Sequence, residues 1–226
     1  MKILIVTTSL LELKGITAHL GLSTSDDNII HSFSFSDLSI DFMRCDPGIF
    51  SMSWLLTTQL MKQNYDLVIN AGICGSFKDK YLPGSILRVR RDMFADIGVH
   101  AEGGFSDLFD LGLIRQDSHP FFEKFLFDSP GEYQKIFENL VTVKAVTVNQ
   151  VPLEENIRGK LEKIYDPDIE TMEGAAFFYV CAKMYANYVQ LRAVSNYTDE
   201  RDKSNWETNK ALMNLGIFLK EMIHGF

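Results

Sequence analysis

The sequence predicts an α/β fold in which helices cover both faces of a central mixed sheet, a three-layer α/β/α arrangement. Short apolar runs alternate along the chain with segments that have helical apolar spacing, and such alternation is typical of strand–helix units. The chain has 226 residues, of which 46% are hydrophobic and 23% are charged, a balance that suits one globular domain. No linker or internal repeat divides it, so we expect a single domain over residues 1–226.

The expected strands differ in how deeply they are buried. Lys2–Val6 is continuously apolar, as in a strand covered on both faces, whereas Ser85–Arg91 alternates and ends in charge, which indicates partial exposure. The remaining expected strands are Asp66–Asn70, Val141–Val148 and Val189–Val194. In sheets of this kind ligands collect at the carboxyl ends of the strands.

Helices are expected where apolar residues recur at helical spacing: Leu10–Leu20, Ile49–Lys62, Glu170–Tyr185 and Trp206–Ile223. The third has apolar and small residues all round its start, which indicates a buried helix. The Phe-rich segment from His100 to Glu132 has weak periodicity. It is expected to be either a functional lid or subunit contact, or a pair of short helices that cover the sheet.

The composition narrows the classes of partner. The formal net charge of −8 argues against nucleic acid or an anionic membrane surface as the main partner. The three cysteines have no CxxC spacing, which favours free thiols in a reducing compartment. The five histidines lack metal-ligand spacing, so we expect no metal and no other cofactor.

The chain is also expected to work in the cytoplasm, without a membrane partner. Its N-terminal apolar run, Met1–Val6, is too short for the core of a signal peptide. No stretch approaches the roughly 18 apolar residues that a membrane span needs.

Three short strings are candidates for chemistry, and each also has a purely structural explanation. In NAGICG (Asn70–Gly75), glycines of a turn would let a ligand approach the backbone, although any tight turn after a strand uses glycines. In ETMEGAA, acidic residues suit a helix N-terminus, yet Glu173 precedes tiny residues in a buried helix and needs a partner such as ligand hydroxyls. In RAVSNYT (Arg192–Thr198), polar residues follow a strand, either as site residues or as a turn.

Taken in order, these strings resemble the purine and uridine phosphorylase family, in its nucleosidase branch. The series begins with MKILIV and a following glutamate, continues through NAGICG, PGS and FAD (Phe94–Asp96), and ends with ETMEGAA and RAVSN. It spans nearly the whole chain. The extension RDKSNW (Arg201–Trp206) makes the chain similar to the futalosine hydrolases of an alternative menaquinone pathway. The resemblance implies a phosphorylase/hydrolase-like fold and hydrolysis of a purine nucleoside at its N-glycosidic bond.

The resemblance also implies roles for individual residues. Glu173 would hold the ribose 2′- and 3′-hydroxyls and favour the cationic transition state, and Met172 would pack beneath the sugar. Glu12 matches the glutamate that positions or deprotonates the attacking water; otherwise it is a solvated residue of the first helix. Val148 and Asn149 match the segment whose backbone contacts the base.

Residue 196 departs from the pattern of nucleosidases that act on adenine nucleosides, which carry Asp at this position. Asn196, next to Ser195 in the Ser-Asn motif, has an amide nitrogen with two hydrogens, which suit the N7 and O6 acceptors of a 6-oxopurine. We therefore expect futalosine to be split to hypoxanthine and dehypoxanthine futalosine. An Asn is not an acid, so the proton for N7 would come from water or from Asp199.

Hydrolysis is expected in preference to phosphorolysis. The Gly and Arg positions that hold phosphate in the phosphorylases are not apparent near Thr7–Leu11, and the apolar Ile73 stands where a phosphate-contacting polar residue would be expected. The alternatives are a methylthioadenosine/adenosylhomocysteine or aminofutalosine nucleosidase, then a purine nucleoside phosphorylase, or a nucleoside-binding protein without activity.

Two features of the substrate site remain open in the sequence. The bulky carboxylated 5′ group of futalosine would meet Arg88, Arg90 or Arg91, unless these form a solvated strand edge. The family usually forms homodimers in which the neighbouring subunit closes the pocket. We therefore expect a homo-oligomer, with the Phe-rich segment 100–132 as a possible wall.

Overall fold

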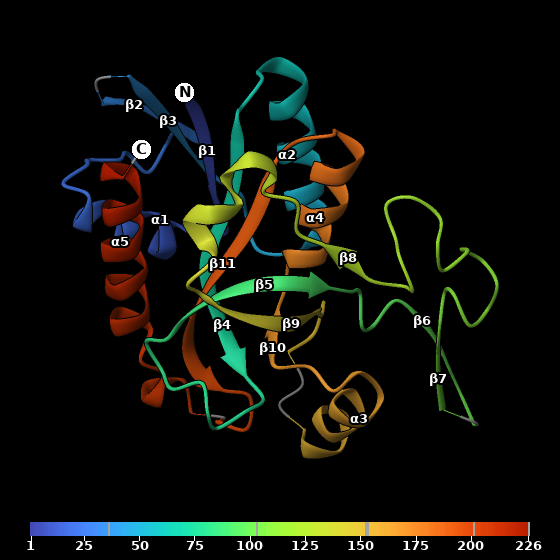
Figure 1. The fold of residues 1–226 in the computed structure, drawn as a ribbon. Coiled ribbons are helices and arrows are strands. Elements are labelled where there is room, and N and C mark those ends of the chain that lie inside the picture. Colours follow the sequence, from blue (N-terminus) through green and yellow to red (C-terminus); the bar gives the residue numbers. More distant parts are fainter. Residues whose placement is uncertain (36, 103, 152–153, 201, 226) are drawn as a thin grey trace.

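A mixed sheet of nine strands runs through the computed structural model, which describes residues 1–35, 37–102, 104–151, 154–200 and 202–225 (Figure 1). Eight of its strands follow one another across the sheet, and the short β8 (Leu126–Phe127) pairs with β5 beside them. Their order is β10 (Ile169–Thr171), β9 (Val141–Thr147), β5 (Ile86–Asp92), β11 (Tyr188–Tyr197), β4 (Leu67–Ser76), β1 (Lys2–Thr7), β3 (Leu38–Arg44) and β2 (Ile30–Phe35).

The short strand β10 closes part of this sheet on itself. It pairs in parallel with β9 and antiparallel with β4, so that β4, β11, β5, β9 and β10 form a ring. The pairs β1–β3, β1–β4 and β4–β11 are parallel, whereas β5–β11 and β2–β3 are antiparallel. The expected mixed sheet is confirmed.

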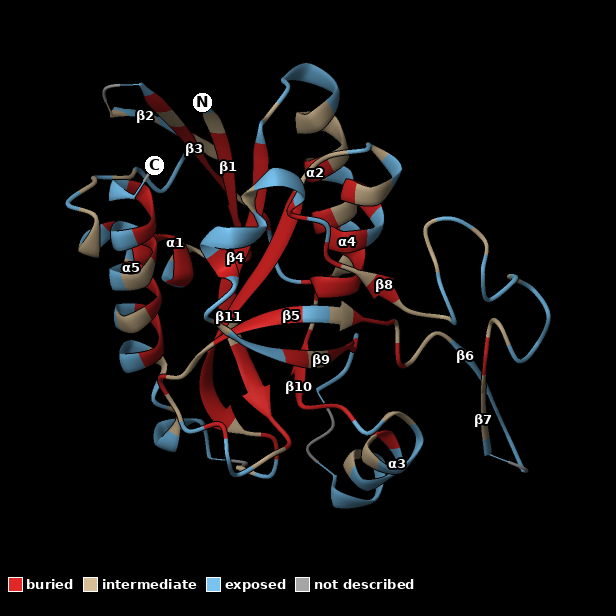
Figure 2. Cartoon of the chain, viewed as in Figure 1, coloured by how far each residue is buried: buried red, intermediate tan, exposed pale blue. Residues whose placement is uncertain are grey.

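Helices cover both faces of the sheet. The helices α1 (Leu10–His19) and α5 (Thr208–His224) pack on one face, and α2 (Ile49–Lys62) and α4 (Gly174–Lys183) pack on the other (Figure 1). The apolar run in strand β1 is explained by burial on both faces of the strand. Ile3 and Ile5 belong to the core beneath α1 and α5, while Leu4 and Val6 belong to the core beneath α2 and α4. The strands of the centre are accordingly buried (Figure 2).

A third, smaller core lies under α3 (Glu155–Tyr165), where Leu161 packs with Phe77, Met93 and Val148. Two 3-10 helices, Gly131–Phe137 and Lys203–Asn205, complete the helical segments. The strands β6 (Gly98–Ala101) and β7 (Gly104–Asp107) form a separate hairpin that projects from the body (Figure 1). None of the helices in the described part of the chain combines the length and the hydrophobicity that a membrane span requires.

Several expectations about local structure are wrong. NAGICG is not a turn, because β4 continues through Gly72 to Ser76 with partners on both sides. Glu170 belongs to a strand, so the expected helix begins only at Gly174. The Phe-rich segment 100–132 holds no pair of helices among its described residues.

Candidate active site

A cavity of about 280 Å³ opens where the carboxyl ends of β4 and β11 meet the first turn of α1 and the start of α4. Seven of the eight residues that the sequence marked as candidates line it: Glu12, Ile73, Val148, Met172, Glu173, Ser195 and Asn196. A larger hollow of about 730 Å³ between α1 and α5 has no carboxylate in its lining. Paired acidic groups therefore favour the smaller cavity as the reaction site.

Glu12 is held rigidly in this cavity. Ser9 caps α1 by accepting a hydrogen bond from the Glu12 amide at 3.1 Å. The Glu12 Oε2 atom accepts from both the amide and the hydroxyl of Thr8 at 2.8 Å, and Oε1 accepts from the Ile73 amide at 2.9 Å. The side chain is 4% exposed, so it is not a solvated helix residue. Ile73 thus contributes its backbone N–H.

A buried guanidinium lies beside Glu12. A Cβ atom on Gly72 would stand 2.5 Å from Glu12 Oε1 and 2.6 Å from Arg192 Nη1, so both groups rest against this glycine, which must lack a side chain. Arg192 Nε donates to Gln190 Oε1 at 2.8 Å, and Gln190 Nε2 donates to Asp92 Oδ2 at 3.1 Å. This chain of contacts orients the guanidinium, whose Nη2 atom has no partner among the described residues.

No pattern in the sequence indicates the role of Arg192, because an arginine inside a strand can be either a buried ion or an edge residue. Its neighbour in the contact chain, Asp92, is fully enclosed, and burial raises the pKa of its carboxyl to about 6. Hydrogen bonds from Gln190 and Thr147 oppose this rise. With this pKa the Asp92 carboxyl is mostly ionised at neutral pH, and through Gln190 it offsets part of the charge of Arg192.

Glu173 stands just before α4, which begins at Gly174. Its Oε1 atom accepts a hydrogen bond from the Gly48 amide at 2.8 Å. Burial raises the pKa of Glu173, while the positive charge of Arg192 acts in the opposite direction and the charge of Glu12 adds to the rise. Two carboxyl groups and one guanidinium thus surround the same space, a set that can hold hydroxyl groups and a water molecule.

Asn196 lies beyond a bulge in β11, between Val194 and Asn196, that leaves Ser195 without a register partner on β4. Ser195 Oγ lies 2.7 Å from Asn196 Oδ1, which orients the amide group. Asn196 Nδ2 donates to the Tyr197 carbonyl at 2.9 Å. One of its two hydrogens is therefore engaged within the protein, and only the second remains for a ligand.

Asn149 is the candidate that the structure places elsewhere. Its backbone and side-chain nitrogens both donate to Asp96, and its side chain lines a second cavity of about 740 Å³ beside α3. Val148 lines both cavities, but its amide donates to the Thr171 carbonyl. The backbone N–H groups of both residues therefore donate within the protein and are not free to donate to a ligand.

The basic residues expected at the 5′ end are not at the cavity. Arg88 and Arg90 both contact the buried Asp128, and Arg91 lies over the Phe125 ring. The described lining contains instead Lys203 and Trp206 of the RDKSNW string, whose first residue, Arg201, lies outside the described residues. Asp199 is exposed and does not line the cavity.

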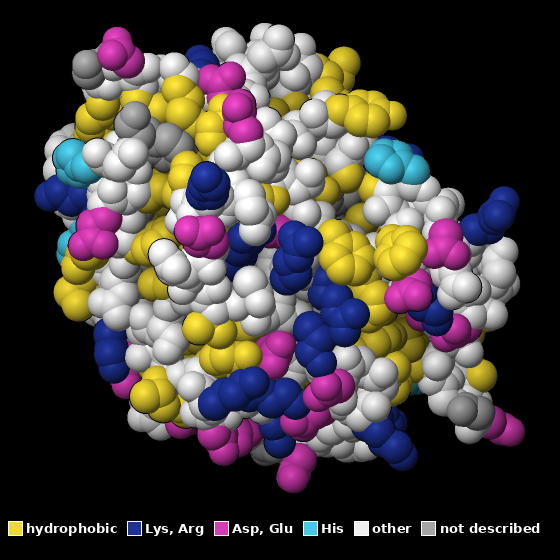
Figure 3. Space-filling view, in the orientation of Figure 1, with side chains coloured by type: hydrophobic (Ala, Val, Ile, Leu, Met, Phe, Trp, Pro, Cys, Tyr) yellow, Lys and Arg dark blue, Asp and Glu magenta, His cyan; other side chains and the backbone are white. Residues whose placement is uncertain are grey.

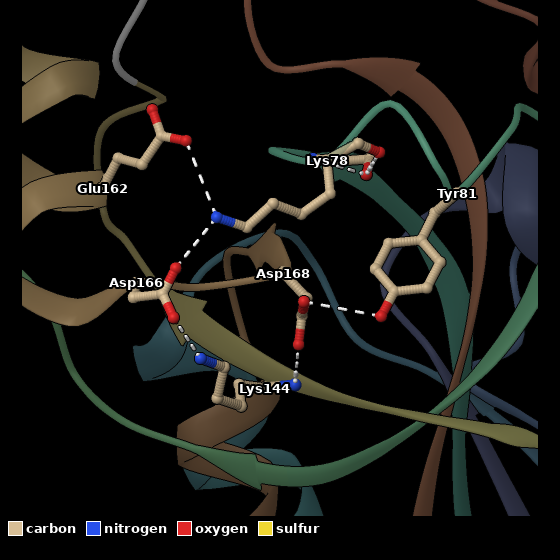
Figure 4. Close-up of polar contacts among 7 residues, drawn as sticks. Lys78, Tyr81, Lys144, Glu162, Asp166 and Asp168 are labelled. Atoms are coloured by element: carbon tan, nitrogen blue, oxygen red, sulfur yellow. Dashed lines mark hydrogen bonds and ion pairs between the residues drawn. The ribbon is translucent and has the colours of Figure 1, made fainter.

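A cluster of charges anchors the strand that carries Glu170 (Figure 4). Asp166, at the end of α3, accepts from Lys78 at 2.9 Å and from Lys144 at 2.6 Å. Asp168 accepts from the Lys144 amide at 2.9 Å and from the Tyr81 hydroxyl at 3.4 Å. Because Asp168 immediately precedes β10, these contacts tie its start to β9 and to the β4–β5 turn.

The described residues contain no group of three His, Cys, Asp or Glu side chains that could hold a metal ion. The three cysteines are buried and free, and burial raises the pKa of the Cys74 thiol at the cavity to about 12. Cys74 is thus a neutral thiol, not a nucleophilic thiolate. The chemistry that the cavity supports is that of carboxyl groups and a water molecule.

Known proteins with similar sequences act as hydrolases. The chain is 29% identical over 157 residues to the futalosine hydrolase of Thermus thermophilus, covering 67% of each chain. It is also 29% identical to the futalosine hydrolase of Streptomyces coelicolor, covering 66% of this chain and 61% of the relative. The chain thus spans about two thirds of the length of these curated relatives.

Solved structures confirm the fold. A futalosine hydrolase mutant of Helicobacter pylori superposes with a TM-score of 0.81 at 18% identity, over 100% of this chain and 99% of the other. A 5′-methylthioadenosine/S-adenosyl homocysteine nucleosidase of the same organism gives a TM-score of 0.82 at 18% identity, over 100% and 98% of the two chains.

The curated relatives indicate that the chain is an N-glycosyl hydrolase, a nucleosidase, and the solved structures show that it has the fold of such enzymes. The family model described as the phosphorylase superfamily matches residues 47–224, which is most of the chain. The protein therefore belongs to the phosphorylase superfamily.

Proposed function

We propose that this protein hydrolyses the N-glycosidic bond of a 6-oxopurine nucleoside, and that its substrate is futalosine, converted to hypoxanthine and dehypoxanthine futalosine in menaquinone biosynthesis. One observation carries the proposal: the rigidly held Glu12 carboxylate shares a cavity with Glu173, Arg192 and Asn196. The futalosine hydrolases among the relatives support the choice of substrate.

Bond cleavage leaves positive charge on the ribose ring, and carboxylates near the ring stabilise it. Glu173 accepts hydrogen bonds from the ribose hydroxyls in this proposal, and Met172, which lines the cavity beside it, supplies an apolar surface for the sugar. Glu12 takes a proton from the water that attacks C1′. Arg192, adjacent to Glu12 across Gly72, orients that water through its guanidinium.

The contacts of Glu12 favour water over phosphate as the nucleophile. A phosphorylase needs donors that converge on an anion. Here the Thr8 amide, the Thr8 hydroxyl and the Ile73 amide are all spent on the Glu12 carboxylate. A phosphate that approached these donors would meet a negative side chain instead, which costs free energy through repulsion.

Lys203 supports a substrate with a carboxylated 5′ group. It is exposed at the cavity, beside the Trp206 ring at 5.8 Å from the ring centroid. The other described basic residue of the lining, Arg192, is 1% exposed and engaged with Gln190. We assign the recognition of the substrate carboxylate to Lys203, in place of the arginines of β5.

We also propose that the protein forms a homo-oligomer and works in the cytoplasm. Oligomer formation is supported by exposed hydrophobic side chains on the segment that follows the β6–β7 hairpin, where Leu113 is 70% and Phe122 is 59% exposed. A cytoplasmic location is supported by the three free cysteines, because thiols stay reduced in that compartment. The partner is a small nucleoside, with neither nucleic acid nor membrane, consistent with the net charge of −8.

The test is incubation of the purified protein with futalosine, inosine or methylthioadenosine, with and without phosphate, followed by chromatography of the free base. The expected result is hypoxanthine from futalosine at a rate independent of phosphate, and a large loss of this activity in Glu12→Gln. Release that requires phosphate would assign a phosphorylase, and release of adenine alone would assign a methylthioadenosine nucleosidase. No released base would leave a nucleoside-binding protein.

A further inference from the structure

Glu170 is a third carboxyl group in the lining of the cavity, beside Glu12 and Glu173. It stands on β10 in register with Gly75 of β4, and Gly75 is in register with Asn196 of β11 on its other side. Register partners of neighbouring strands direct their side chains to the same face of a sheet. Glu170 and Asn196 thus flank one glycine, and both line the cavity.

The Glu170 carboxyl leans over this glycine toward β11. A Cβ atom on Gly75 would stand 3.3 Å from Glu170 Oε1 and 3.2 Å from Thr198 Cγ2. The Cα atoms of residues 170 and 196 are separated by two strand spacings, about 10 Å.

The side chain of Glu170 lacks the contacts that a structural carboxylate normally has. It is 6% exposed, and its Oε2 atom has no hydrogen-bond partner among the described residues. A buried carboxylate without donors is costly, so burial favours the neutral, proton-carrying form of this group. Burial raises the pKa of Glu170 to about 7, against the lowering effect of Arg158.

The reaction needs a proton at this end of the cavity. When the C1′–N9 bond breaks, its electron pair goes to the purine, and the departing base must take up a proton. Asn196 has an amide in place of an acid and cannot supply one. Of the other titratable groups in the described lining, Glu12 and Glu173 are assigned to water and sugar, Cys74 stays a neutral thiol, and Arg192 and Lys203 are cations.

We propose that Glu170 is the general acid that protonates the leaving purine, acting across Gly75 from Asn196, an inference that rests on the proposed nucleosidase function. The C1′–N9 electron pair moves to the base, and the Glu170 proton passes to a ring nitrogen of the base. Water adds its oxygen to C1′ and gives one proton to Glu12. Exchange with solvent then returns a proton to Glu170 and removes one from Glu12.

The first experiment measures the pH profile of kcat for hydrolysis of the purine nucleoside by the wild type and by Glu170→Gln. The wild-type rate should fall as pH rises above about 7, where Glu170 loses its proton. In Glu170→Gln, kcat should drop roughly 10²- to 10⁴-fold and the alkaline fall should disappear. Glu155→Gln, an exposed carboxyl of α3, is the matched control and should behave as the wild type.

A second substrate separates acid catalysis from a structural effect. p-Nitrophenyl β-D-ribofuranoside has a leaving group that needs no protonation. Glu170→Gln should therefore cleave it nearly as fast as the wild type, whereas Glu12→Gln should lose activity on both substrates. The inference would be overturned if Glu170→Gln lost the same fraction of activity on both substrates. It would also be overturned if Glu170→Gln cleaved the nucleoside at the wild-type rate.

A variant that keeps Glu170 but changes its pKa tests the proposal even if Glu170→Gln fails to fold. Among the described residues, the charged or titratable groups that face Glu170 are Arg158 of α3 and Cys74 of β4. Strand β9 presents the apolar Val146, and Thr198, which follows β11, contacts the same glycine. Arg158→Gln removes a positive charge that lowers the pKa of Glu170, so the alkaline limb should move to higher pH. Lys163→Gln, an exposed cation of the same helix, should not move it.

An unmoved limb in Arg158→Gln would contradict the role of Glu170. The two proposals fail differently. If the wild type releases base while Glu170→Gln matches its rate, only the acid is wrong. If the wild type cleaves no nucleoside, the proposed function itself is wrong.

Discussion

Asn196 sets the chemistry of one edge of the base. Its oxygen is turned toward Ser195 and one amide hydrogen is bound to the Tyr197 carbonyl, so it presents a single donor to a ligand. A donor suits N7 or O6 of a 6-oxopurine, whereas the 6-amino group of adenine would place its own hydrogens against it.

Asn196→Asp should therefore shift the preference toward 6-aminopurine nucleosides. A carboxyl group can accept from the 6-amino group and, when protonated, donate to N7. We expect the ratio of kcat/KM for inosine to that for adenosine to fall by roughly 10- to 100-fold. Asn205→Asp, an exposed substitution of the same kind, is the control, and an unchanged ratio in Asn196→Asp would contradict base selection by this residue.

Glu170 should make the stability of the wild type depend on pH. Its folded pKa of about 7 lies above the ordinary value of 4.5, so the folded protein binds the proton more tightly than the unfolded chain does. The stabilisation is complete below pH 4.5 and is lost as pH rises through 7. At pH 8 the free energy of unfolding is therefore lower than at pH 4.5 by at most about 3 kcal/mol through this group.

Glu170→Gln removes that loss. Its free energy of unfolding should exceed that of the wild type at pH 8 and equal it near pH 4, as measured by urea titrations at both values. A variant that is less stable than the wild type at pH 8 would show that the carboxylate is satisfied in the folded protein.

Lys203 belongs to the same scale, because its charge acts on one group of the substrate. Lys203→Met should raise KM for futalosine roughly 10-fold, the effect of one partly exposed ion pair to a ligand, and leave KM for inosine unchanged. Lys160→Met, an exposed lysine outside this cavity, is the control. Equal changes for futalosine and inosine would place the substrate carboxylate elsewhere.

At the scale of elements, β10 is three residues long and depends on its surroundings. Its pairing with β9 and β4 is supported by the charges around Asp166 and Asp168 (Figure 4). Hydrogen bonds from Lys144 and Lys78 lower the pKa of Asp166 to about 2. This carboxylate therefore contributes to stability above pH 4, and its contribution is lost as pH falls toward 2.

The double variant Lys78→Gln, Lys144→Gln tests that support. We expect Tm to fall by a few degrees at pH 7 and low salt, because both lysines are partly exposed and solvent screens them. The difference from the wild type should shrink in about 1 M salt and near pH 2. Lys62→Gln, at the exposed end of α2, is the control, and a Tm difference that persists in high salt would indicate packing rather than charge.

At the scale of the whole molecule, the β6–β7 hairpin and the irregular segment after it stand away from the body (Figure 1). Their residues are largely exposed or half-buried (Figure 2), and hydrophobic side chains gather between this projection and the body (Figure 3). An apolar surface of this kind on a projecting segment suits contact with a second copy of the chain.

Light scattering should therefore show a homo-oligomer, and Leu113→Glu with Phe122→Glu should reduce its mass to that of the monomer or a smaller assembly, because charges at an apolar contact resist burial. Leu82→Glu, at an equally exposed position of the β4–β5 turn, should leave the mass unchanged. A monomeric wild type would contradict the proposed assembly.

The sequence by itself determined the parts of this protein that depend on local pattern. Positions 3–6 of β1 are apolar because both faces of the strand are covered, and helix α2 begins and ends at the predicted Ile49 and Lys62. The ordered motifs also indicated the family, and seven of the residues they marked share one cavity.

Only the tertiary structure decided what depends on distant partners. The strands β2 and β3 were not predicted, and NAGICG and Glu170 became strand because β4 and β10 pair across the chain, Ile169 with Ser76 and Glu170 with Gly75. Arg192 joined the site through its contacts with Gln190 and the Gly72 surface. A side chain's neighbours, burial and protonation follow from three-dimensional packing, and no local spacing in the sequence encodes them.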